Sequence, residues 1–176
     1  MIGTSGSGKS RFARQLAAAL KIPYLEMDRL YWTPNWQEAN DEEFCSILEH
    51  ALSGDAWGLD GNYTRTTHIK WPRANLVVWI DYSFPLTLYR VIKRSILRAW
   101  KKQELWPGTG NRESFTRLFS KDSMVLWTLS HYASNKGKFE ELMATESYAH
   151  IEFVRLRSPK EAAALIQNLT NRDQQA

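Results

Sequence analysis

This sequence of 176 residues has a single cysteine, few histidines and no long apolar run. The only cysteine, Cys45, excludes an internal disulfide framework and a cysteine-based metal site, and the four histidines lack zinc-ligand spacing. The longest apolar run, Leu76 to Ile80, is far too short to cross a bilayer. Because no basic segment followed by an apolar one opens the chain, we expect a cytoplasmic protein of one domain without a membrane partner.

Acidic residues are scarce in one part of the chain. Residues 86–121 contain nine lysines and arginines but only Glu104 and Glu113, so this segment carries +7 and the remainder −3 of the overall +4. A local cationic block indicates an anionic partner at one place rather than a chain that coats nucleic acid along its length. The basic residues of this segment are Arg90, Lys93, Arg94, Arg98, Lys101, Lys102, Arg112, Arg117 and Lys121.

What the sequence does contain is a complete phosphate-binding pattern at its start. Residues 3–10 read Gly-Thr-Ser-Gly-Ser-Gly-Lys-Ser and match G-x-x-x-x-G-K-[S/T] at every fixed position. Small residues let the backbone N–H groups turn toward phosphate oxygens, Lys9 brings a cation to the β- and γ-phosphates, and Ser10 offers its hydroxyl to Mg²⁺. The pattern predicts that ATP and Mg²⁺ are the cofactors; the alternative is a chance turn of small residues. The predicted nucleotide-binding residues are Gly3, Ser5, Gly6, Ser7, Gly8, Lys9 and Ser10.

The strand expected to lead into this loop is short. Such a loop normally follows a buried parallel strand of about five residues, and here only Met1 and Ile2 precede Gly3. We therefore expect that the natural chain starts several residues upstream or that this first strand is truncated. Because the strand lies in the middle of a sheet, its shortness predicts a gap between its two neighbours.

Strands and helices are expected to alternate along the chain. Apolar spacing predicts helices at residues 11–20, 41–52, 85–101, 114–134, 138–145 and 159–170, and strands at 24–27, 56–59, 76–80 and 151–156. The apolar face predicted for the third of these helices is Leu88, Ile92, Ile96 and Trp100. The order predicts an α/β fold with a central parallel sheet of about five strands, helices on both sides, and a basic helical lid at about residues 98–122.

Acidic and aromatic residues follow the predicted strands. Asp28, Asp60 and Asp81 come just after strand ends, where ligands of open parallel sheets bind, so each is a candidate for metal or substrate contact. The alternative for each is a turn aspartate that caps the next segment. We expect Asp60 to hold the water shell of Mg²⁺ and Asp28 to bind or deprotonate an acceptor hydroxyl. Trp32 and Trp36 lie where an acceptor would dock, either stacking on a base or packing against a helix.

Five stretches resemble the adenylate-kinase-like branch of the P-loop kinases, and in particular small bacterial proteins described as adenylate kinases or DNA topology modulation proteins. They are the loop at residues 3–10, Met27-Asp28-x-Leu30-x-Trp32, Asp60-Gly61-Asn62-Tyr63-x-Arg65, Arg90-x-x-x-Arg94 and Val154-x-Leu156-Arg157-Ser158. The loop is typical of the whole superfamily, whereas the Asp-Gly-Asn-Tyr stretch points to the narrower family. The resemblance extends over the whole chain and implies a three-layer P-loop NTPase fold.

The resemblance also implies residue roles. Adenylate kinases carry Asp-Gly-Phe-Pro-Arg after the third strand, with the Asp near Mg²⁺ and the Arg on the nucleoside monophosphate. Asp60 and Arg65 would take those roles, although an Asn-Tyr pair replaces Phe-Pro and Arg65 is displaced by one position. Arg90 and Arg94 match two arginines at the opening of the lid that touch ATP phosphates. Residues 30–40 do not resemble an AMP-binding domain, so the acceptor remains open.

These features together predict an ATP-binding phosphotransferase that moves the γ-phosphoryl group to a small acceptor bearing a hydroxyl or a phosphate. The alternatives are a nucleotide-binding regulatory protein that affects DNA topology through the basic segment, and an inactive ATP binder. The predicted catalytic residues are Lys9, Asp28, Arg90 and Arg94, the substrate-binding residues are Asp28, Trp32 and Arg65, and the metal-binding residues are Ser10 and Asp60.

Overall fold

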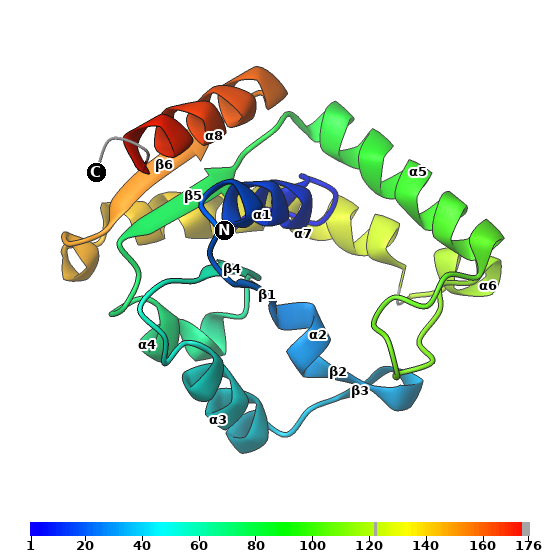
Figure 1. Cartoon of the computed structure of the whole chain (residues 1–176). Coiled ribbons are helices and arrows are strands. Elements are labelled where there is room, and N and C mark those ends of the chain that lie inside the picture. The colour runs from blue at the N-terminus through cyan, green and yellow to red at the C-terminus, as the bar shows by residue number, and fades with distance from the viewer. Residues whose placement is uncertain (122, 174–176) are drawn as a thin grey trace.

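The computed structural model describes residues 1–121 and 123–173, which form a mixed α/β fold as predicted (Figure 1). The helices are α1 (Lys9–Ala19), α2 (Met27–Tyr31), α3 (Asp41–Ala51), α4 (Thr67–Lys70), α5 (Phe84–Lys101), α6 (Phe115–Leu118), α7 (Met124–Ala144) and α8 (Pro159–Asp173). The strands are β1 (Tyr24–Glu26), β2 (Trp32–Thr33), β3 (Gln37–Glu38), β4 (Gly58–Asp60), β5 (Leu76–Ile80) and β6 (Glu152–Leu156). Short 3₁₀ turns lie at Pro34–Trp36, Thr64–Thr66 and Glu146–Tyr148.

The expected five-stranded sheet is not continuous in the described residues. The strands form the parallel pairs β1–β4 and β5–β6 and the antiparallel pair β2–β3. Met1 and Ile2 lie between β4 and β5, where Ile2 makes a single parallel bridge to Trp79. Two residues are too few to form a ladder with either neighbour, so β4 and β5 remain in separate pairs. The gap predicted from the short lead-in is therefore present.

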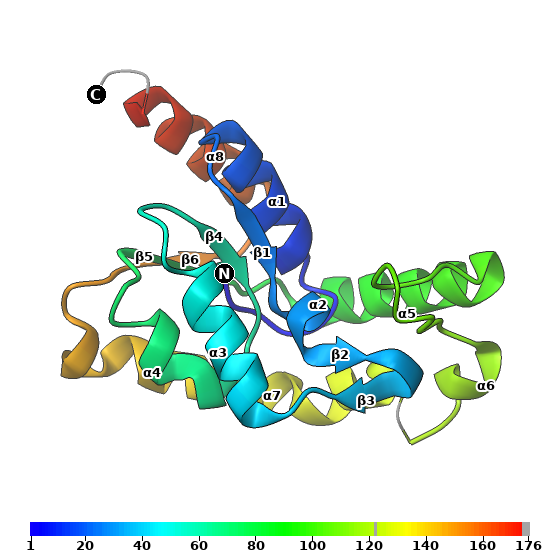
Figure 2. The same cartoon turned by 60° about the horizontal axis from the view of Figure 1, so that its bottom comes forward.

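Alternate residues of β5 face opposite layers. Val78 and Ile80 pack with Phe12 of α1 and with α8 in one buried cluster, whereas Trp79 packs with Phe139 of α7 in another. This period of two is what a strand covered on both faces requires. Figure 2 shows α1 and α8 on one side of the strands and α7 on the other.

A third buried cluster is formed mainly by the segment that connects β1 to β4. It contains Met27 and Tyr31 of α2, Phe44 and Leu48 of α3, and residues from β4 and α4. The side chain of Asn40 caps α3 by accepting from the N–H of Glu42 at 2.8 Å. This cluster fixes α2, which carries residues predicted to bind the acceptor.

Two predictions for the long helices are wrong. The expected helices at 114–134 and 138–145 are instead α6 and a single continuous α7, because Gly137 stays inside the helix and the break falls before Met124. In α5 the buried residues are Thr87, Val91, Ser95 and Ala99. Ile96 of the predicted apolar face is 40% exposed and Trp100 is 77% exposed. Thr87 and Val91 are buried because this part of α5 lies directly against Gly6 of the loop at residues 3–10. The helix α5 also packs against α7.

The lid predicted at residues 98–122 consists of the end of α5, a folded loop and α6, while Asp122 lies outside the described residues. Within the loop, the N–H of Leu105 donates to the C=O of Asn111 at 2.9 Å. The main chains of Glu104 and Arg112 form an isolated antiparallel β-bridge. None of the helices in residues 1–121 and 123–173 is long and apolar enough to cross a membrane.

Candidate functional site

The loop at residues 3–10 folds tightly between Ile2 and α1. The N–H of Ser7 donates to the C=O of Thr4 at 3.1 Å. Gly6 and Gly8 have φ values of 82° and 98°, which residues with side chains rarely adopt. A Cβ at position 6 would lie 2.7 Å from the carbonyl oxygen of Thr87 on α5. Both backbone conformation and space therefore require glycine at position 6.

The amino end of α1 is open toward this loop. Gly8 is the N-cap residue, so no side chain caps the helix, and no acidic residue lies in its first turn. Its N–H groups and the positive end of its dipole are therefore available to an anion. The buried Ser7 hydroxyl has no hydrogen-bond partner in the part of the chain that the structure describes. Ser7 does not line the cavity, and its Oγ lies beside Gly3 instead. The free N–H groups at the helix end are therefore the part of the loop that fits a phosphate ligand.

Lys9 and Ser10 begin α1 and line a cavity of about 740 Å³. Both cationic and acidic side chains line this cavity. The cations that line it are Lys9, Arg65, Arg94, Arg98, Arg117 and Lys121, and the acids are Glu26, Asp28, Glu38 and Glu113. The excess of cations suits an anionic ligand, and the acids provide acceptors for hydroxyl groups.

The start of the loop is held by Asn62, which sequence reasoning did not assign. Its side-chain amide donates to the C=O of Gly3 at 2.6 Å, and its Oδ1 accepts from the N–H of Gly3 at 3.1 Å. The two bonds fix both main-chain polar groups of Gly3, and so the peptide units on either side of its Cα. Asn62 also lines the cavity, so it joins the loop to the substrate side of the site.

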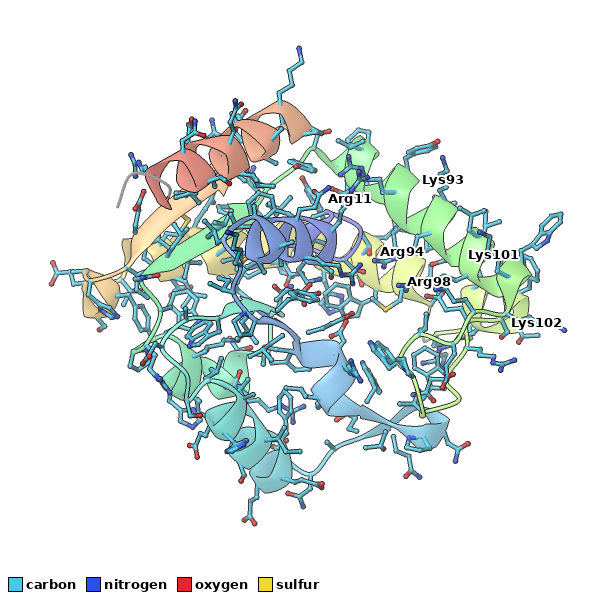
Figure 3. All side chains as sticks on the ribbon, viewed as in Figure 1. Arg11, Lys93, Arg94, Arg98, Lys101 and Lys102 are labelled. Atoms are coloured by element: carbon cyan, nitrogen blue, oxygen red, sulfur yellow. The ribbon has the colours of Figure 1, made fainter. Side chains whose placement is uncertain are left out.

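The two arginines predicted to contact phosphates both reach the loop. Arg94 donates from Nη2 to the hydroxyl of Ser5 at 2.9 Å, and Arg90 donates from Nη1 to the C=O of Ser7 at 3.2 Å. Burial and, to a smaller extent, the charge of Arg98 lower the pKa of Arg94 to about 10. Figure 3 shows Arg94 and Arg98 on the side of α5 that faces the loop.

The predicted metal residue Asp60 is buried at the carboxyl end of β4, where the hydroxyl of Tyr24 donates to it at 3.4 Å. Glu26 pairs with Asp60 across the β1–β4 ladder and lines the cavity, which Asp60 does not. Burial, then the charges of Asp60 and Asp28, raise the pKa of Glu26. Among the described residues, no three acidic, histidine or cysteine side chains are grouped to hold a metal ion by themselves. A bound Mg²⁺ would therefore need Ser10 and phosphate oxygens as further ligands.

The acceptor side of the cavity is formed by α2 and the residues after β4. The hydroxyl of Tyr63 donates to Oδ1 of Asp28 at 2.7 Å, which fixes the carboxylate at the cavity wall. Burial and the charge of Asp28 raise the pKa of Tyr63, so this hydroxyl keeps its proton and remains a donor. Arg65 lines the same cavity, but it pairs with Asp41 and lies 4.6 Å above the ring of Tyr31.

Tryptophan side chains connect the acceptor side to the lid. Trp106 of the lid stacks on Trp32 with ring centroids 6.1 Å apart and meets Trp36 edge-on at 5.8 Å. Asn111 of the lid accepts from the N–H of Trp36 at 2.9 Å and donates to the C=O of Thr33 at 2.9 Å. The tryptophans at 32 and 36 therefore pack against each other and the lid, and both line the cavity.

Asp81 lies away from this constellation. It accepts from Nε and Nη2 of Arg155 on β6 at 2.8 and 2.6 Å, so it joins the ends of the β5–β6 pair. The position of Asp81 after a strand suggested a substrate contact or a turn cap, but its carboxylate is instead paired with Arg155. A turn aspartate and an ion-paired one have the same sequence pattern, because the partner lies 74 residues further along the chain.

The sequence did not reveal Glu26, Asn62 and Asn111 as site residues. Asn62 follows a strand end by two residues, a position that could have drawn attention to it. Glu26 was taken as an ordinary strand residue, and Asn111 lies in a loop with no recognised motif. Their roles depend on long-range contacts, such as the 75 residues between Trp36 and Asn111.

Comparison with known proteins gives no further guide to this site. No protein-family model, no curated protein and no solved structure matches the chain. The chemistry of the site is therefore argued from its own residues.

Proposed function

We propose that this protein is an ATP-binding phosphotransferase with a P-loop NTPase fold of the adenylate-kinase-like type. The main support for the proposal is that Arg90 and Arg94 both form hydrogen bonds with the loop at residues 3–10. The loop offers free helix N–H groups, and the two arginines donate to it from α5. Phosphoryl transfer depends mainly on holding and neutralising phosphate oxygens, which these groups are suited to do.

In the proposed reaction the loop amides and Lys9 hold the β- and γ-phosphates. Ser10 would ligate Mg²⁺, and Asp60 would hold its water shell; the bound ion would neutralise charge on the phosphates. An acceptor oxygen attacks the γ-phosphorus, the bond to the β-phosphate oxygen breaks, and ADP leaves. Asp28 takes the acceptor proton, and Arg94 neutralises the transferring group. Tyr63 keeps Asp28 directed at the cavity through the 2.7 Å hydrogen bond.

The acceptor is proposed to be a small molecule bearing a hydroxyl or a phosphate. It would bind among Asp28, Trp32 and Arg65, which line the same cavity as Lys9. The cavity of about 740 Å³ has room for a nucleotide together with a small second molecule. Exclusion of water by the lid loop would limit transfer to water.

Replacing Lys9 tests the proposal. We expect Lys9→Ala to reduce transfer from [γ-³²P]ATP at least 100-fold on a panel of nucleoside monophosphates and small alcohols, with an unchanged melting temperature. The matched control is Lys160→Ala, an exposed lysine in the first turn of α8, which should retain full activity. Equal turnover by Lys9→Ala and the unmodified chain would reject the proposal.

The DNA-binding alternative has less support from the contacts. Arg90 and Arg94 are directed at the loop and Arg98 pairs with Glu113 at 3.4 Å, which leaves fewer free cations for a duplex. Lys93, Lys101 and Lys102 are exposed. If DNA were the partner, its affinity would fall steeply with salt, whereas we expect weak binding with a shallow slope.

A further inference from the structure

The outer side of α5 carries a stripe of apolar side chains that are exposed to solvent. The α5 stripe consists of Tyr89, Ile92, Ile96, Leu97 and Trp100, whose exposed fractions lie between 37% and 77%. Their spacing along the chain places them side by side on one face of a helix. The buried residues of α5 lie on its other face, against the loop at residues 3–10 and α7. A continuous exposed apolar face of this kind is typical of a surface that binds another molecule.

Lysines border the α5 stripe, and acidic residues are absent from this part of the chain. Lys93 lies among the apolar residues, and Lys101 and Lys102 follow at the carboxyl end of the helix; all three are exposed. Residues 82–103 contain no Asp or Glu. Within residues 1–121 and 123–173, none of the three lysines forms an ion pair. Figure 3 shows Lys93 on the outer side of α5 and the other two at its end. The exposed face of α5 is therefore both apolar and cationic.

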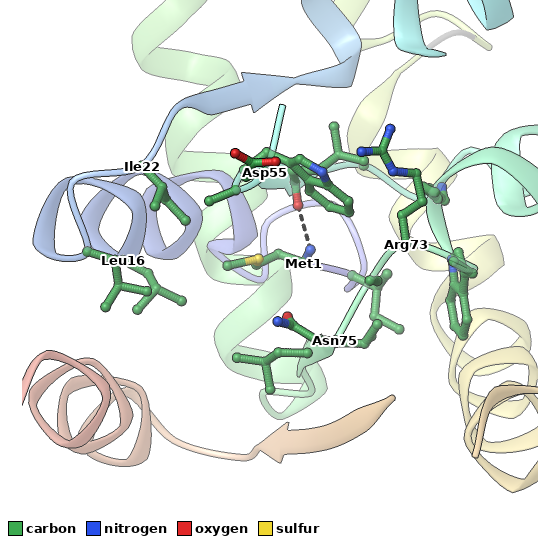
Figure 4. A pocket seen from close by; sticks show the side chains of 17 residues that line it. Met1, Leu16, Ile22, Asp55, Arg73 and Asn75 are labelled. Atoms are coloured by element: carbon green, nitrogen blue, oxygen red, sulfur yellow. Dashed lines mark hydrogen bonds between the residues drawn. The ribbon is translucent and has the colours of Figure 1, made fainter. Parts of the chain in front are cut away.

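This face is separate from the proposed nucleotide site. On the inner side of α5, Arg90 and Arg94 bond to the loop at residues 3–10, and Arg98 pairs with Glu113. The stripe and its three lysines line neither the cavity of about 740 Å³ nor the cavity of about 290 Å³ at the amino ends of β4 and β5, which Figure 4 shows. Binding of ATP and a small acceptor therefore leaves part of the cationic segment at residues 86–121 without a role.

The chemistry of this face favours an anionic lipid surface over other partners. A second copy of the chain would bring lysines together with no acid on either stripe to pair with them. DNA would accept the lysines, but it would leave the apolar side chains without apolar contacts. At an anionic membrane, apolar side chains enter the boundary between headgroups and acyl chains, while lysines beside them reach the lipid phosphates. Tyr89 and Trp100, at the two ends of the stripe, carry the ring types that favour this boundary.

We propose that α5 docks this protein on an anionic membrane surface, with the α5 stripe in the headgroup region and its three lysines on anionic lipid headgroups. The helix lies parallel to the membrane surface in this arrangement. The expectation of no membrane partner rested on the lack of an apolar run long enough to cross a bilayer. A helix that lies on the surface needs no such run. The arginines on the inner side of α5 keep their bonds to the loop at residues 3–10 when the outer side docks.

Sedimentation with lipid vesicles tests the proposal. In about 0.1 M salt, the unmodified chain should bind vesicles of phosphatidylcholine with about 30 mol% phosphatidylglycerol at least tenfold more tightly than vesicles of phosphatidylcholine alone. The double variant Ile96→Ser/Trp100→Ser should bind the anionic vesicles at least tenfold more weakly, at an unchanged melting temperature. The matched control is Ile47→Ser on α3, because Ile47 is 38% exposed and Ile96 is 40% exposed. This control should bind as the unmodified chain does.

The contribution of charge is tested by a triple variant at the α5 lysines, Lys93→Gln/Lys101→Gln/Lys102→Gln. It should bind anionic vesicles about 100-fold more weakly, because each lysine near such a surface contributes roughly fivefold. The control removes the same charge from exposed lysines outside α5, with Lys21→Gln/Lys138→Gln/Lys160→Gln. Its affinity should fall much less.

Several results would overturn the proposal. Absence of binding to anionic vesicles would do so, as would equal binding to neutral ones. Equal losses in the two lysine variants, or none in Ile96→Ser/Trp100→Ser, would indicate an attraction by net charge rather than docking of α5. A chain that is dimeric in analytical ultracentrifugation, and monomeric in the same double variant, would show that a second copy covers the stripe. These measurements need no nucleotide, so they do not depend on the proposed phosphotransferase activity.

Discussion

The two ends of the strands β4 and β5 differ sharply in chemistry. At their carboxyl ends, Asn62 and the arginines of α5 make directed hydrogen bonds to the loop at residues 3–10. At their amino ends, a cavity of about 290 Å³ is walled mainly by apolar side chains. In parallel sheets, ligands bind beyond the carboxyl ends of strands. The two ends therefore differ in kind, with directed polar groups at one and an apolar wall at the other, and this difference supports placing the proposed ligand site at the carboxyl ends.

Gly6→Ala should give the largest effect at the carboxyl-end site. The new Cβ would lie 2.7 Å from the carbonyl oxygen of Thr87 in a backbone with φ of 82°. We expect the free energy of unfolding to fall by about 4 kcal/mol and affinity for Mg²⁺ and an ATP analogue to fall at least 100-fold. Urea denaturation and calorimetric titration measure the two quantities.

The matched control is Gly137→Ala in α7, where a Cβ would meet nothing within 4 Å. This change should stabilise the protein by up to about 1 kcal/mol, because alanine favours helix. Equal effects of the two substitutions would contradict the close approach of α5 to the loop.

The pH dependence of stability tests the burial of the two amines, Met1 and Lys70, that line the cavity at the amino ends. Burial lowers the pKa of the Met1 amine from 8.0 to about 5 and the pKa of Lys70 from 10.5 to about 7. The unfolded chain therefore binds more protons than the folded one, and the free energy of unfolding should rise with pH, by about 3 kcal/mol between pH 6 and 8. Urea denaturation at several pH values measures this slope.

Lys70→Met separates the two contributions to that slope. It should reduce the rise above pH 7, where only the folded-state lysine loses its proton, and leave most of the rise below pH 7 to the Met1 amine. Lys160→Met, at an exposed site, should leave the slope unchanged. A flat profile for the unmodified chain would mean that both groups stay hydrated and charged.

Asn62→Ala should have a smaller effect than Gly6→Ala. Both hydrogen bonds to Gly3 would be lost, which should lower the free energy of unfolding by about 2 kcal/mol and weaken binding of the ATP analogue about tenfold. Asn168→Ala, on an exposed part of α8, is the control and should change neither quantity measurably. A wild-type affinity in Asn62→Ala would show that the loop keeps its shape without this side chain.

Asn111→Ala should give the smallest of these effects, because it acts on the lid rather than on the loop. Loss of the bonds to Trp36 and Thr33 should cost about 1 kcal/mol and speed hydrogen exchange at the Trp36 N–H about fivefold. Unchanged exchange at Trp36 would mean that the tryptophan contacts alone hold the lid in place.

Local patterns in the sequence predicted much of this fold. β5 occupies the predicted residues 76–80, because a continuous apolar run between polar residues is a strong strand signal. α8 begins at Pro159 after a capping box in which Ser158 and Glu161 bond reciprocally, as their spacing predicts. The first helix was predicted at residues 11–20 and begins two residues earlier, at Lys9.

The errors arose where distant contacts decide the structure. The buried face of α5 was predicted wrongly because it is set by partners far away in the chain: Thr87 and Val91 lie against Gly6, and the helix packs against α7. In the same way, Asp81 was read as a turn or ligand residue because Arg155 lies far along the chain. The site residues Asn62 and Asn111 belong to this class, since each bonds to main chain that no local pattern identifies.

Calorimetric titration with a non-hydrolysable ATP analogue and Mg²⁺, on the unmodified chain and on Lys9→Ala, tests the central proposal most directly. We expect one binding site per chain with a dissociation constant in the micromolar range, and affinity at least 100-fold weaker in Lys9→Ala at an unchanged melting temperature. Equal affinity of the two chains, or no binding by the unmodified chain, would contradict the assignment of the loop at residues 3–10 as a nucleotide site.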